Sequence, residues 1–354
     1  MTITYTRREC LTMLASAAAL PAVLSQRVTA AGKPMRGAFM ILSTPFTETG
    51  AVDWDDLARE TAFVDRCGAH GAVWPQGSSG VANLTRDERL RGMEILAKAI
   101  QGKKTALVLG VQGKDTPEML DYAHRAEALA PDAMIAMPPS AARSVEEYRE
   151  YFRALAQVTK RPVIVQTSGG ARDLPPPVDL IVSLAREFPH LGYVKEESAP
   201  VLERMTSEVA QRPPLTSVFG ASFATGWLYE MRLGLDGVIT GNAMYADLMA
   251  RMWAFHEQRQ LEPLRDAFSK FLLMRNLAAQ IPGADLYVMK KRGIFKTTAT
   301  RSGGIGGGAR VTTLKFTADQ VAEIEYRFAA LTPYLSGPVA LSPADAESEP
   351  SSVK

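Results

Sequence analysis

The chain has 354 residues, of which 46% are hydrophobic and 22% are charged, and its formal net charge is +2. This balance is ordinary for a soluble globular protein, and it lacks the basic excess with which nucleic-acid-binding proteins attract phosphate. The two cysteines and four histidines are scattered along the chain without metal-ligand spacing, so we expect no nucleic-acid partner and no metal site.

The first 31 residues are predicted to form an export signal that is not part of the fold. Paired arginines at positions 7 and 8 precede an apolar run over residues 11–24, and small residues follow at 28–30. A charged start, a short apolar run and an A-x-A-like end are the parts of a signal peptide. The start resembles a twin-arginine signal, with Cys10 in place of the usual phenylalanine. It predicts a periplasmic protein with no membrane contact after cleavage; an ordinary Sec signal or an uncleaved anchor is the alternative.

Between residues 37 and 245, short apolar runs alternate with longer amphipathic stretches. Eight runs are predicted strands: residues 37–42, 71–76, 105–110, 133–138, 162–167, 192–196, 215–220 and 237–241. The helical stretches between them include residues 54–67, 86–100, 116–129, 145–158, 178–188 and 221–233. Continuous apolar runs that alternate with helices indicate parallel strands covered on both faces. The sequence therefore predicts an α/β fold, a (β/α)8 TIM barrel over residues 36–245.

Further helices are predicted beyond the barrel. Residues 246–335 are expected to form a C-terminal helical extension, and the clearest helical patterns lie in residues 267–280 and 320–335. The glycine-rich stretch between them, residues 301–311, is predicted to be a flexible connection, because it has neither the preceding strand nor the following helix of a phosphate-binding loop. Residues 336–354 are rich in Pro, Ser, Ala and acidic residues without an apolar period, so we expect a disordered tail.

Polar side chains stand where several predicted strands end. Lys195 ends the sixth strand, Ser78 and Ser79 follow the second, and Gln166 and Thr167 end the fifth. Active sites of TIM barrels are built at the carboxyl ends of the strands, so we expect these side chains to converge on one mouth. The turn from Gly77 to Gly80 offers two hydroxyls and successive backbone N–H groups, which is a cradle for a carboxylate; a plain strand-to-helix turn is the alternative.

Lys195 is the strongest chemical signal, because a lysine inside an apolar segment is disfavoured unless it is paired, neutralised or used. Burial penalises the ammonium form and lowers its pKa, and the free amine then attacks a ketone to form a Schiff base. The alternative is a structural ion pair. Glu196 points to the opposite face of the strand, whereas Glu197 shares the face of Lys195 and is the candidate partner.

From about residue 36 to 332 the chain resembles the dihydrodipicolinate synthase and N-acetylneuraminate lyase family of class I pyruvate aldolases. The landmarks occur in order: Thr44-Pro45-Phe46, Gly77-Ser78-Ser79-Gly80 with Leu84-Thr85 and Glu88, Pro138-Pro139, Val194-Lys195-Glu196-Glu197-Ser198 and Gly237-Val238-Ile239-Thr240. The resemblance implies a barrel with extra C-terminal helices, assembled as a tetramer or dimer. It also implies an imine on Lys195, a keto-acid carboxylate bound by Ser78 and Ser79, a pocket lined by the Ile239 carbonyl, and no cofactor.

The departures from the family concern proton transfer. The family usually has a tyrosine relay at the end of strand five, where this chain has Gln166, and glutamine cannot shuttle a proton. Ser140 and Ala141 replace tyrosines that often follow strand four, and Arg172 is the candidate for an arginine expected after strand five. Tyr193 faces the same side as Lys195 and is expected to fill the vacated space. Its hydroxyl either reaches the imine region or serves packing only.

These features together predict an exported lyase, an aldolase or hydro-lyase, that binds a 2-keto acid as a Schiff base on Lys195. The small-molecule partner is expected to be pyruvate or a sugar-acid-derived or aromatic keto acid. The altered tyrosine positions argue against dihydrodipicolinate synthesis itself. The alternative from another class is a non-catalytic periplasmic keto-acid-binding protein that retains the fold and has lost turnover.

Overall fold

The computed structural model describes residues 32–304 and 309–336 of the chain. The predicted export signal and residues 337–354 of the predicted tail lie outside these ranges. Within them, no helix combines the length and apolar character that crossing a membrane requires.

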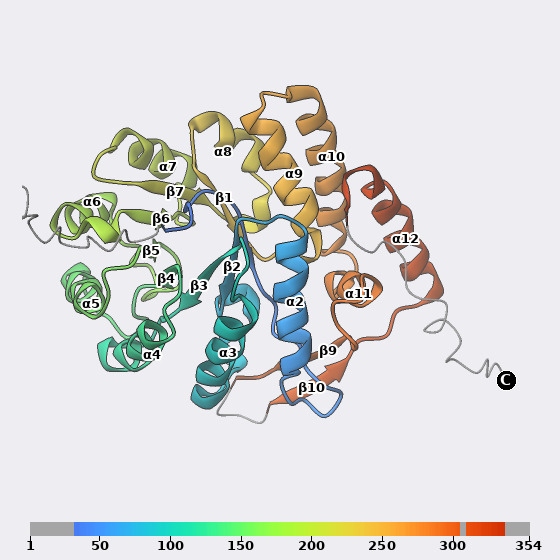
Figure 1. The fold of residues 1–354 in the computed structure, drawn as a ribbon, viewed down its shortest axis with the longest axis horizontal. Helices are drawn as coiled ribbons and strands as arrows, with labels where there is room; N and C mark the ends of the chain where they lie inside the picture. Colours follow the sequence, from blue (N-terminus) through green and yellow to red (C-terminus); the bar gives the residue numbers. More distant parts are fainter. Residues whose placement is uncertain (1–31, 305–308, 337–354) are drawn as a thin grey trace, which may run out of the picture. The chain divides into compact units, whose positions relative to one another are not determined.

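Eight parallel strands close into a barrel in chain order, and the TIM-barrel prediction is confirmed (Figure 1). The strands are β1 Gly37–Ile41, β2 Gly71–Trp74, β3 Ala106–Gly110, β4 Ala133–Ala136, β5 Val163–Gln166, β6 Tyr193–Lys195, β7 Ser217–Gly220 and β8 Gly237–Thr240. Each lies within a predicted apolar run, because a strand that is covered on both faces needs apolar side chains on both of them.

Helices surround the barrel, and several begin at the polar caps that their sequences offer. They are α2 Trp54–Arg66, α3 Arg86–Ala99, α4 Thr116–Ala128, α5 Val145–Val158, α6 Val178–Glu187, α7 Val201–Ala210, α8 Trp227–Leu233 and α9 Ala246–Glu257. Thr85 and Glu88 form a reciprocal capping box at the start of α3. The predicted helix over 221–233 divides into a short 3-10 turn, Ser222–Ala224, and α8.

The boundary between the barrel and its extension differs from the prediction. Helix α9 follows β8 and packs against β1, so it is the eighth barrel helix and not the first helix of the extension. The extension consists of α10 Leu261–Leu277, α11 Ala284–Lys291 and α12 Ala318–Ala329. Helix α10 packs against both α9 and α12, so the extension lies beside the last barrel helix (Figure 1).

The barrel interior is a packed apolar core, with a layer of polar side chains at the carboxyl ends of the strands. The rings of Phe39 and Phe219 meet edge to face at 5.2 Å between centroids. A Cβ at Gly71 would lie 1.9 Å from the Phe39 ring, so glycine at this position makes room for the phenylalanine. In the register of β5 and β6, Tyr193 lies beside Ile164 in the core, and Lys195 lies beside Gln166 one layer nearer the mouth.

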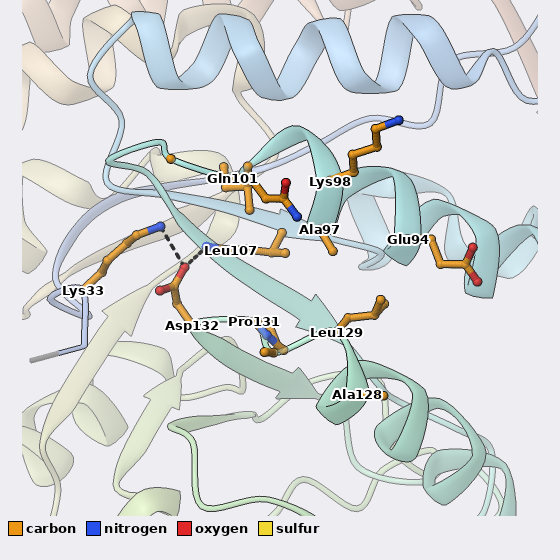
Figure 2. A pocket seen from close by; sticks show the side chains of 13 residues that line it. Lys33, Glu94, Ala97, Lys98, Gln101, Leu107, Ala128, Leu129, Pro131 and Asp132 are labelled. Atoms are coloured by element: carbon orange, nitrogen blue, oxygen red, sulfur yellow. Dashed lines mark hydrogen bonds and ion pairs between the residues drawn. The ribbon is translucent and has the colours of Figure 1, made fainter. Parts of the chain in front are cut away.

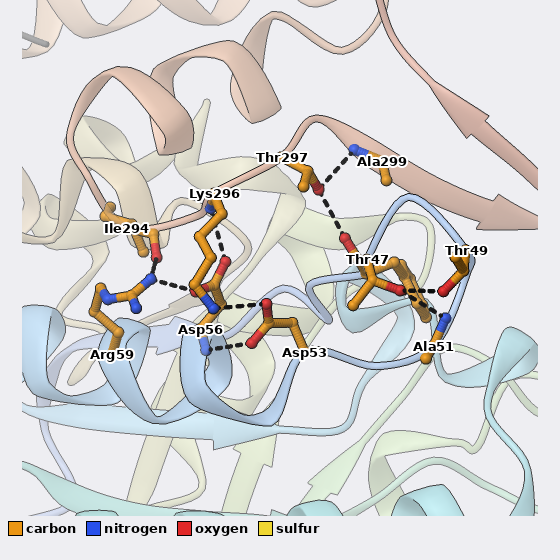
Figure 3. Close-up of polar contacts among 11 residues, drawn as sticks. Thr47, Thr49, Ala51, Asp53, Asp56, Arg59, Ile294, Lys296, Thr297 and Ala299 are labelled. Carbon is orange, nitrogen blue, oxygen red and sulfur yellow. Dashed lines mark hydrogen bonds and ion pairs between the residues drawn. The ribbon is translucent and has the colours of Figure 1, made fainter. Parts of the chain in front are cut away.

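The segment after α11 is tied to the start of α2 (Figure 3). Lys296 donates its backbone N–H to Asp56 at 2.7 Å and its ammonium to Asp53 at 2.9 Å, and the Thr297 hydroxyl donates to the carbonyl of Phe46 at 2.7 Å. These contacts hold the segment after α11 against the loop between β1 and α2.

A hairpin follows this segment, and it corrects the two ends of the predicted flexible connection, because residues 301–302 and 310–311 belong to strands. Strand β9, Ala299–Ser302, pairs antiparallel with β10, Arg310–Thr313, while residues 305–308 lie outside the described ranges. The glycines therefore follow and precede strands. The threonines near both strands favour extended backbone, which explains why these two ends pair.

Candidate active site

Lys195 is the last residue of β6 and lies inside the barrel at its carboxyl end. The residue is only 3% exposed. Burial lowers the pKa of the Lys195 ammonium, and this effect outweighs the opposing attraction of Glu197. A lysine whose charged form is penalised supplies the neutral amine that imine formation requires.

Glu197 is the acidic partner of Lys195, as strand alternation predicts. Its Oε1 lies 2.9 Å from Nζ of Lys195, whereas Glu196 faces the helices and pairs with Arg204. The other oxygen, Oε2, accepts hydrogen bonds from Gln166 Nε2 at 2.8 Å and from the Ser168 hydroxyl. The ion pair and the lowered lysine pKa therefore occur at the same site, although the sequence analysis treated them as alternatives.

Thr167 holds the backbone that carries Glu197. Its hydroxyl accepts the N–H of Glu197 at 2.8 Å and donates to the outward-facing Glu196 at 2.7 Å, while the Ser198 hydroxyl donates to the carbonyl of Thr167. These bonds join the ends of β5 and β6. Thr167 therefore orients the acidic segment, and its hydroxyl is occupied by these bonds within the protein.

The two serines of the Gly77–Gly80 turn have different surroundings. The buried Ser79 hydroxyl donates to the carbonyl of Leu42 at 2.6 Å and accepts the N–H of Gln76 at 3.1 Å. Ser78 is exposed. Both line a cavity of about 260 Å³ whose other walls include Phe223, Gly241 and Arg301. Ser78 is therefore the hydroxyl of the pair that faces outward, and Ser79 shapes the turn.

Arg301 is a member of this cavity wall that the sequence prediction missed. It comes from β9, and its guanidinium makes two hydrogen bonds to Glu88, the shorter at 2.7 Å, and lies 4.6 Å from the Phe46 ring centroid. The threonine-rich flanks of the glycine stretch were the signal for a hairpin here. No local pattern, however, indicates which strand ends the hairpin meets.

Tyr193 and Ile239 belong to the barrel core below the lysine. The hydroxyl of Tyr193 interacts with the side chain of Thr216, the residue before β7, and so lies at the opposite end of the barrel. This placement corrects the expectation of a hydroxyl near the imine and favours packing only. Ile239 is 1% exposed and lies beside Phe39 in the register of β1 and β8.

Arg172, the candidate for an arginine after strand five, contacts its chain neighbour Asp173 and is open to solvent. Its side chain is 95% exposed, and its guanidinium lies 3.6 Å from Asp173.

A hollow of about 790 Å³ lies at the other end of the barrel (Figure 2). Its wall includes Lys33 and Asp132, which are paired at 3.1 Å, and Asp132 also accepts the N–H of Leu107 at 2.7 Å. These bonds hold the segment before β1 against the starts of β3 and β4. The contacts of Asp132 marked in Figure 2 thus join structural elements, and the chemistry-bearing residues lie at the carboxyl ends of the strands.

The chain is a (β/α)8 barrel with a buried lysine at the carboxyl ends of its strands. Comparisons with known proteins give its family. The dihydrodipicolinate synthetase family matches residues 34–271, and the chain belongs to this family. The 4-hydroxy-tetrahydrodipicolinate synthase of Rhizobium meliloti is 26% identical over 49% of this chain and 58% of its own length. That of Chlorobaculum parvum is 27% identical over 58% of this chain and 68% of its own length.

Solved structures share the fold at lower identity. Dihydrodipicolinate synthase from Aquifex aeolicus superposes with a TM-score of 0.71 at 18% identity and covers 85% of this chain and 100% of its own. The enzyme from Acinetobacter baumannii, solved in complex with pyruvate, has a TM-score of 0.71 at 17% identity over 84% of this chain and 99% of its own. These likenesses support the barrel with its C-terminal helices.

Proposed function

We propose that this protein is a lyase that binds a 2-keto acid as a Schiff base on Lys195. The observation that carries the proposal is the buried lysine at the carboxyl end of β6, whose pKa is lowered by burial. Membership of the dihydrodipicolinate synthetase family supports the same chemistry.

In the proposed reaction the neutral amine of Lys195 adds to the ketone carbon, and the oxygen leaves as water. The product is a protonated imine, which accepts the electron pair released when a bond at the adjacent carbon breaks. The imine itself is the electron sink, so the proposal includes no metal or organic cofactor. An aldolase breaks a carbon–carbon bond at that carbon. A hydro-lyase instead removes a proton there, and the hydroxyl on the next carbon leaves with its own electron pair as water. The proposed protein is therefore an aldolase or a hydro-lyase.

The proposed substrate is pyruvate or a keto acid derived from a sugar acid. Its carboxylate would meet the Gly77–Gly80 turn, where the exposed Ser78 lines the 260 Å³ cavity. Gln166 stands at the end of β5, where the family's relay tyrosine is expected, and its amide donates to Glu197 instead of carrying a proton. This difference favours a reaction other than dihydrodipicolinate synthesis.

The proposal is tested by trapping the imine. The protein is incubated with pyruvate, reduced with borohydride and weighed by mass spectrometry, beside Lys195→Ala. The expected adduct has the mass of pyruvate minus water plus two hydrogens, and it is absent from the variant. If neither pyruvate nor a panel of 2-keto acids gives an adduct, the proposal is wrong, and a non-catalytic keto-acid-binding protein becomes the better interpretation.

We further propose that residues 1–31 direct export to the periplasm and that the mature chain forms a dimer or tetramer. The paired arginines and apolar run of the first 31 residues support the first proposal, and the resemblance to oligomeric aldolases supports the second. Cell fractionation beside a variant with both arginines changed to lysine tests export. Light scattering of the mature chain tests assembly, and a monomeric mass would contradict it.

A further inference from the structure

The proposed Schiff-base chemistry requires an acid and a base beside the lysine, and the usual tyrosine position holds Gln166. The Tyr193 hydroxyl interacts with Thr216 at the opposite end of the barrel. Among the described residues, the ionisable side chain against Nζ of Lys195 is Glu197, at 2.9 Å. We propose that Glu197 is the general acid and base of this site, a role that rests on the proposed imine on Lys195.

The geometry gives the two carboxylate oxygens of Glu197 different tasks. Oε2 is fixed by the amide of Gln166 at 2.8 Å and by the Ser168 hydroxyl. Both donors are neutral, so they hold the carboxylate without competing for its proton. Oε1 faces the lysine nitrogen. Gln166 is therefore a positioning residue, and the group that takes and returns protons is the glutamate.

The surroundings of Glu197 also suit proton exchange. Its side chain is 20% exposed, whereas that of Lys195 is 4% exposed, so the acid connects the buried nitrogen to water. The bond from its backbone N–H to Thr167 keeps it over the end of β5. Glu196, its neighbour in the chain, faces outward and does not share this role.

The proton steps balance with Glu197 alone. Transfer from the ammonium to the carboxylate gives a neutral amine and a carboxylic acid. The amine adds to the ketone carbon, the acid protonates the carbonyl oxygen, and the resulting carboxylate removes one proton from nitrogen. The acid then protonates the hydroxyl, water leaves, and a protonated imine faces a carboxylate. That carboxylate next removes a proton from carbon 3, the C–H pair forms the enamine double bond, and the imine π pair moves to nitrogen.

The test separates imine formation from proton removal. Exchange of the methyl hydrogens of pyruvate for deuterium in heavy water, followed by NMR, reports the carbon 3 step, and borohydride trapping reports the imine. Glu197→Gln is expected to form the imine more slowly, because the same acid serves that step, but to reach a trapped yield within about threefold of the parent after long incubation. It is expected to exchange at least about 100-fold more slowly, the scale of general acid–base catalysis. Glu203→Gln is the matched control, because it makes the same chemical change at an exposed residue of α7. It is expected to leave both readouts unchanged.

The outcomes are distinct from failure of the proposed function. A parent protein without any adduct overturns the imine itself, and the role of Glu197 falls with it. A parent that traps pyruvate but exchanges no hydrogen, or a Gln variant that exchanges within about threefold of the parent, overturns only the role of Glu197. If Glu197→Gln does not fold by circular dichroism, Glu197→Asp, which displaces the acid by one methylene, is used. An Asp variant that traps pyruvate and exchanges as fast as the parent overturns the assignment; slowed exchange supports it.

Discussion

Two ion pairs lie on opposite faces of the end of β6. Lys195 pairs with Glu197 inside the barrel, and Glu196 pairs with Arg204 of α7 outside it at 3.0 Å. The outer carboxylate is fully buried and also bonded to Thr167 and the backbone of Ser198, whereas the inner one is 20% exposed. Adjacent glutamates thus belong to a closed cluster on one face and to a partly exposed pair, the proposed reactive one, on the other.

The difference lies in how each cluster handles protons. Outside, burial and the neighbouring Glu196 raise the pKa of Glu208 to about 10, so this third acid is neutral at pH 7 and the charges of Glu196 and Arg204 balance. Inside, the pKa of Lys195 is lowered by burial, and its partner is an acid. A shared proton can therefore move without creating net charge, which makes only the inner pair suited to catalysis.

The largest expected effect comes from Lys195→Arg, which keeps the charge of the inner pair and removes its nucleophile. Arginine stays protonated, so the trapped adduct should disappear entirely, while stability to urea should change by about 1–3 kcal/mol because a bulkier group must be packed. Borohydride trapping and urea unfolding measure the two effects. Lys291→Arg, at another buried pair with Glu325, should keep the adduct. An adduct in the Lys195 variant would assign the imine to another lysine.

The outer pair should respond in the opposite way. Arg204→Met leaves Glu196 buried without its cation, so the free energy of unfolding should fall by about 3–5 kcal/mol. The adduct yield per folded molecule should not change. Urea unfolding with Arg232→Met, an exposed arginine of α8, provides the comparison, and the control should change stability by no more than about 0.5 kcal/mol. A large loss of adduct in folded Arg204→Met would show that the two faces are coupled.

The fold was predictable because burial on both faces gives each strand a continuous apolar run. Strand alternation also indicated that Glu197, and not Glu196, shares the face of Lys195. The contact between Gln166 and Glu197 could not be predicted from the sequence, because Glu197 lies past the end of β6 and its position depends on bonds to Thr167. Arg301 was missed for a related reason: contacts more than 200 residues apart in sequence bring it to the mouth.

A smaller effect is expected from the pH dependence of the outer cluster. The folded pKa of Glu208 is raised from 4.5 to about 10, so the folded chain binds more protons than the unfolded chain between these values. Its stabilising contribution is complete below the unfolded pKa and is lost as pH rises through the folded one, by at most about 1.4 kcal/mol per pH unit. Glu208→Gln cannot titrate.

Urea unfolding at pH 5, 7 and 9 should therefore show the Gln variant gaining stability relative to the parent as pH rises. Glu203→Gln, the exposed change on the same helix, should keep a constant difference from the parent. Parallel curves for the parent and Glu208→Gln would mean that Glu208 ionises normally.

The smallest effect is expected inside the barrel, below the reactive pair. Tyr193 shares the inner face of β6 with Lys195, but its hydroxyl meets Thr216 at the far end. Tyr193→Phe keeps the ring in the core and removes only the interaction of the hydroxyl with Thr216, so stability should fall by no more than about 1.5 kcal/mol. Adduct yield and hydrogen exchange should match the parent, because no reacting atom lies near that hydroxyl. A tenfold loss of exchange with normal folding would instead place the tyrosine in the proton path and weaken the division between the open mouth and the packed core.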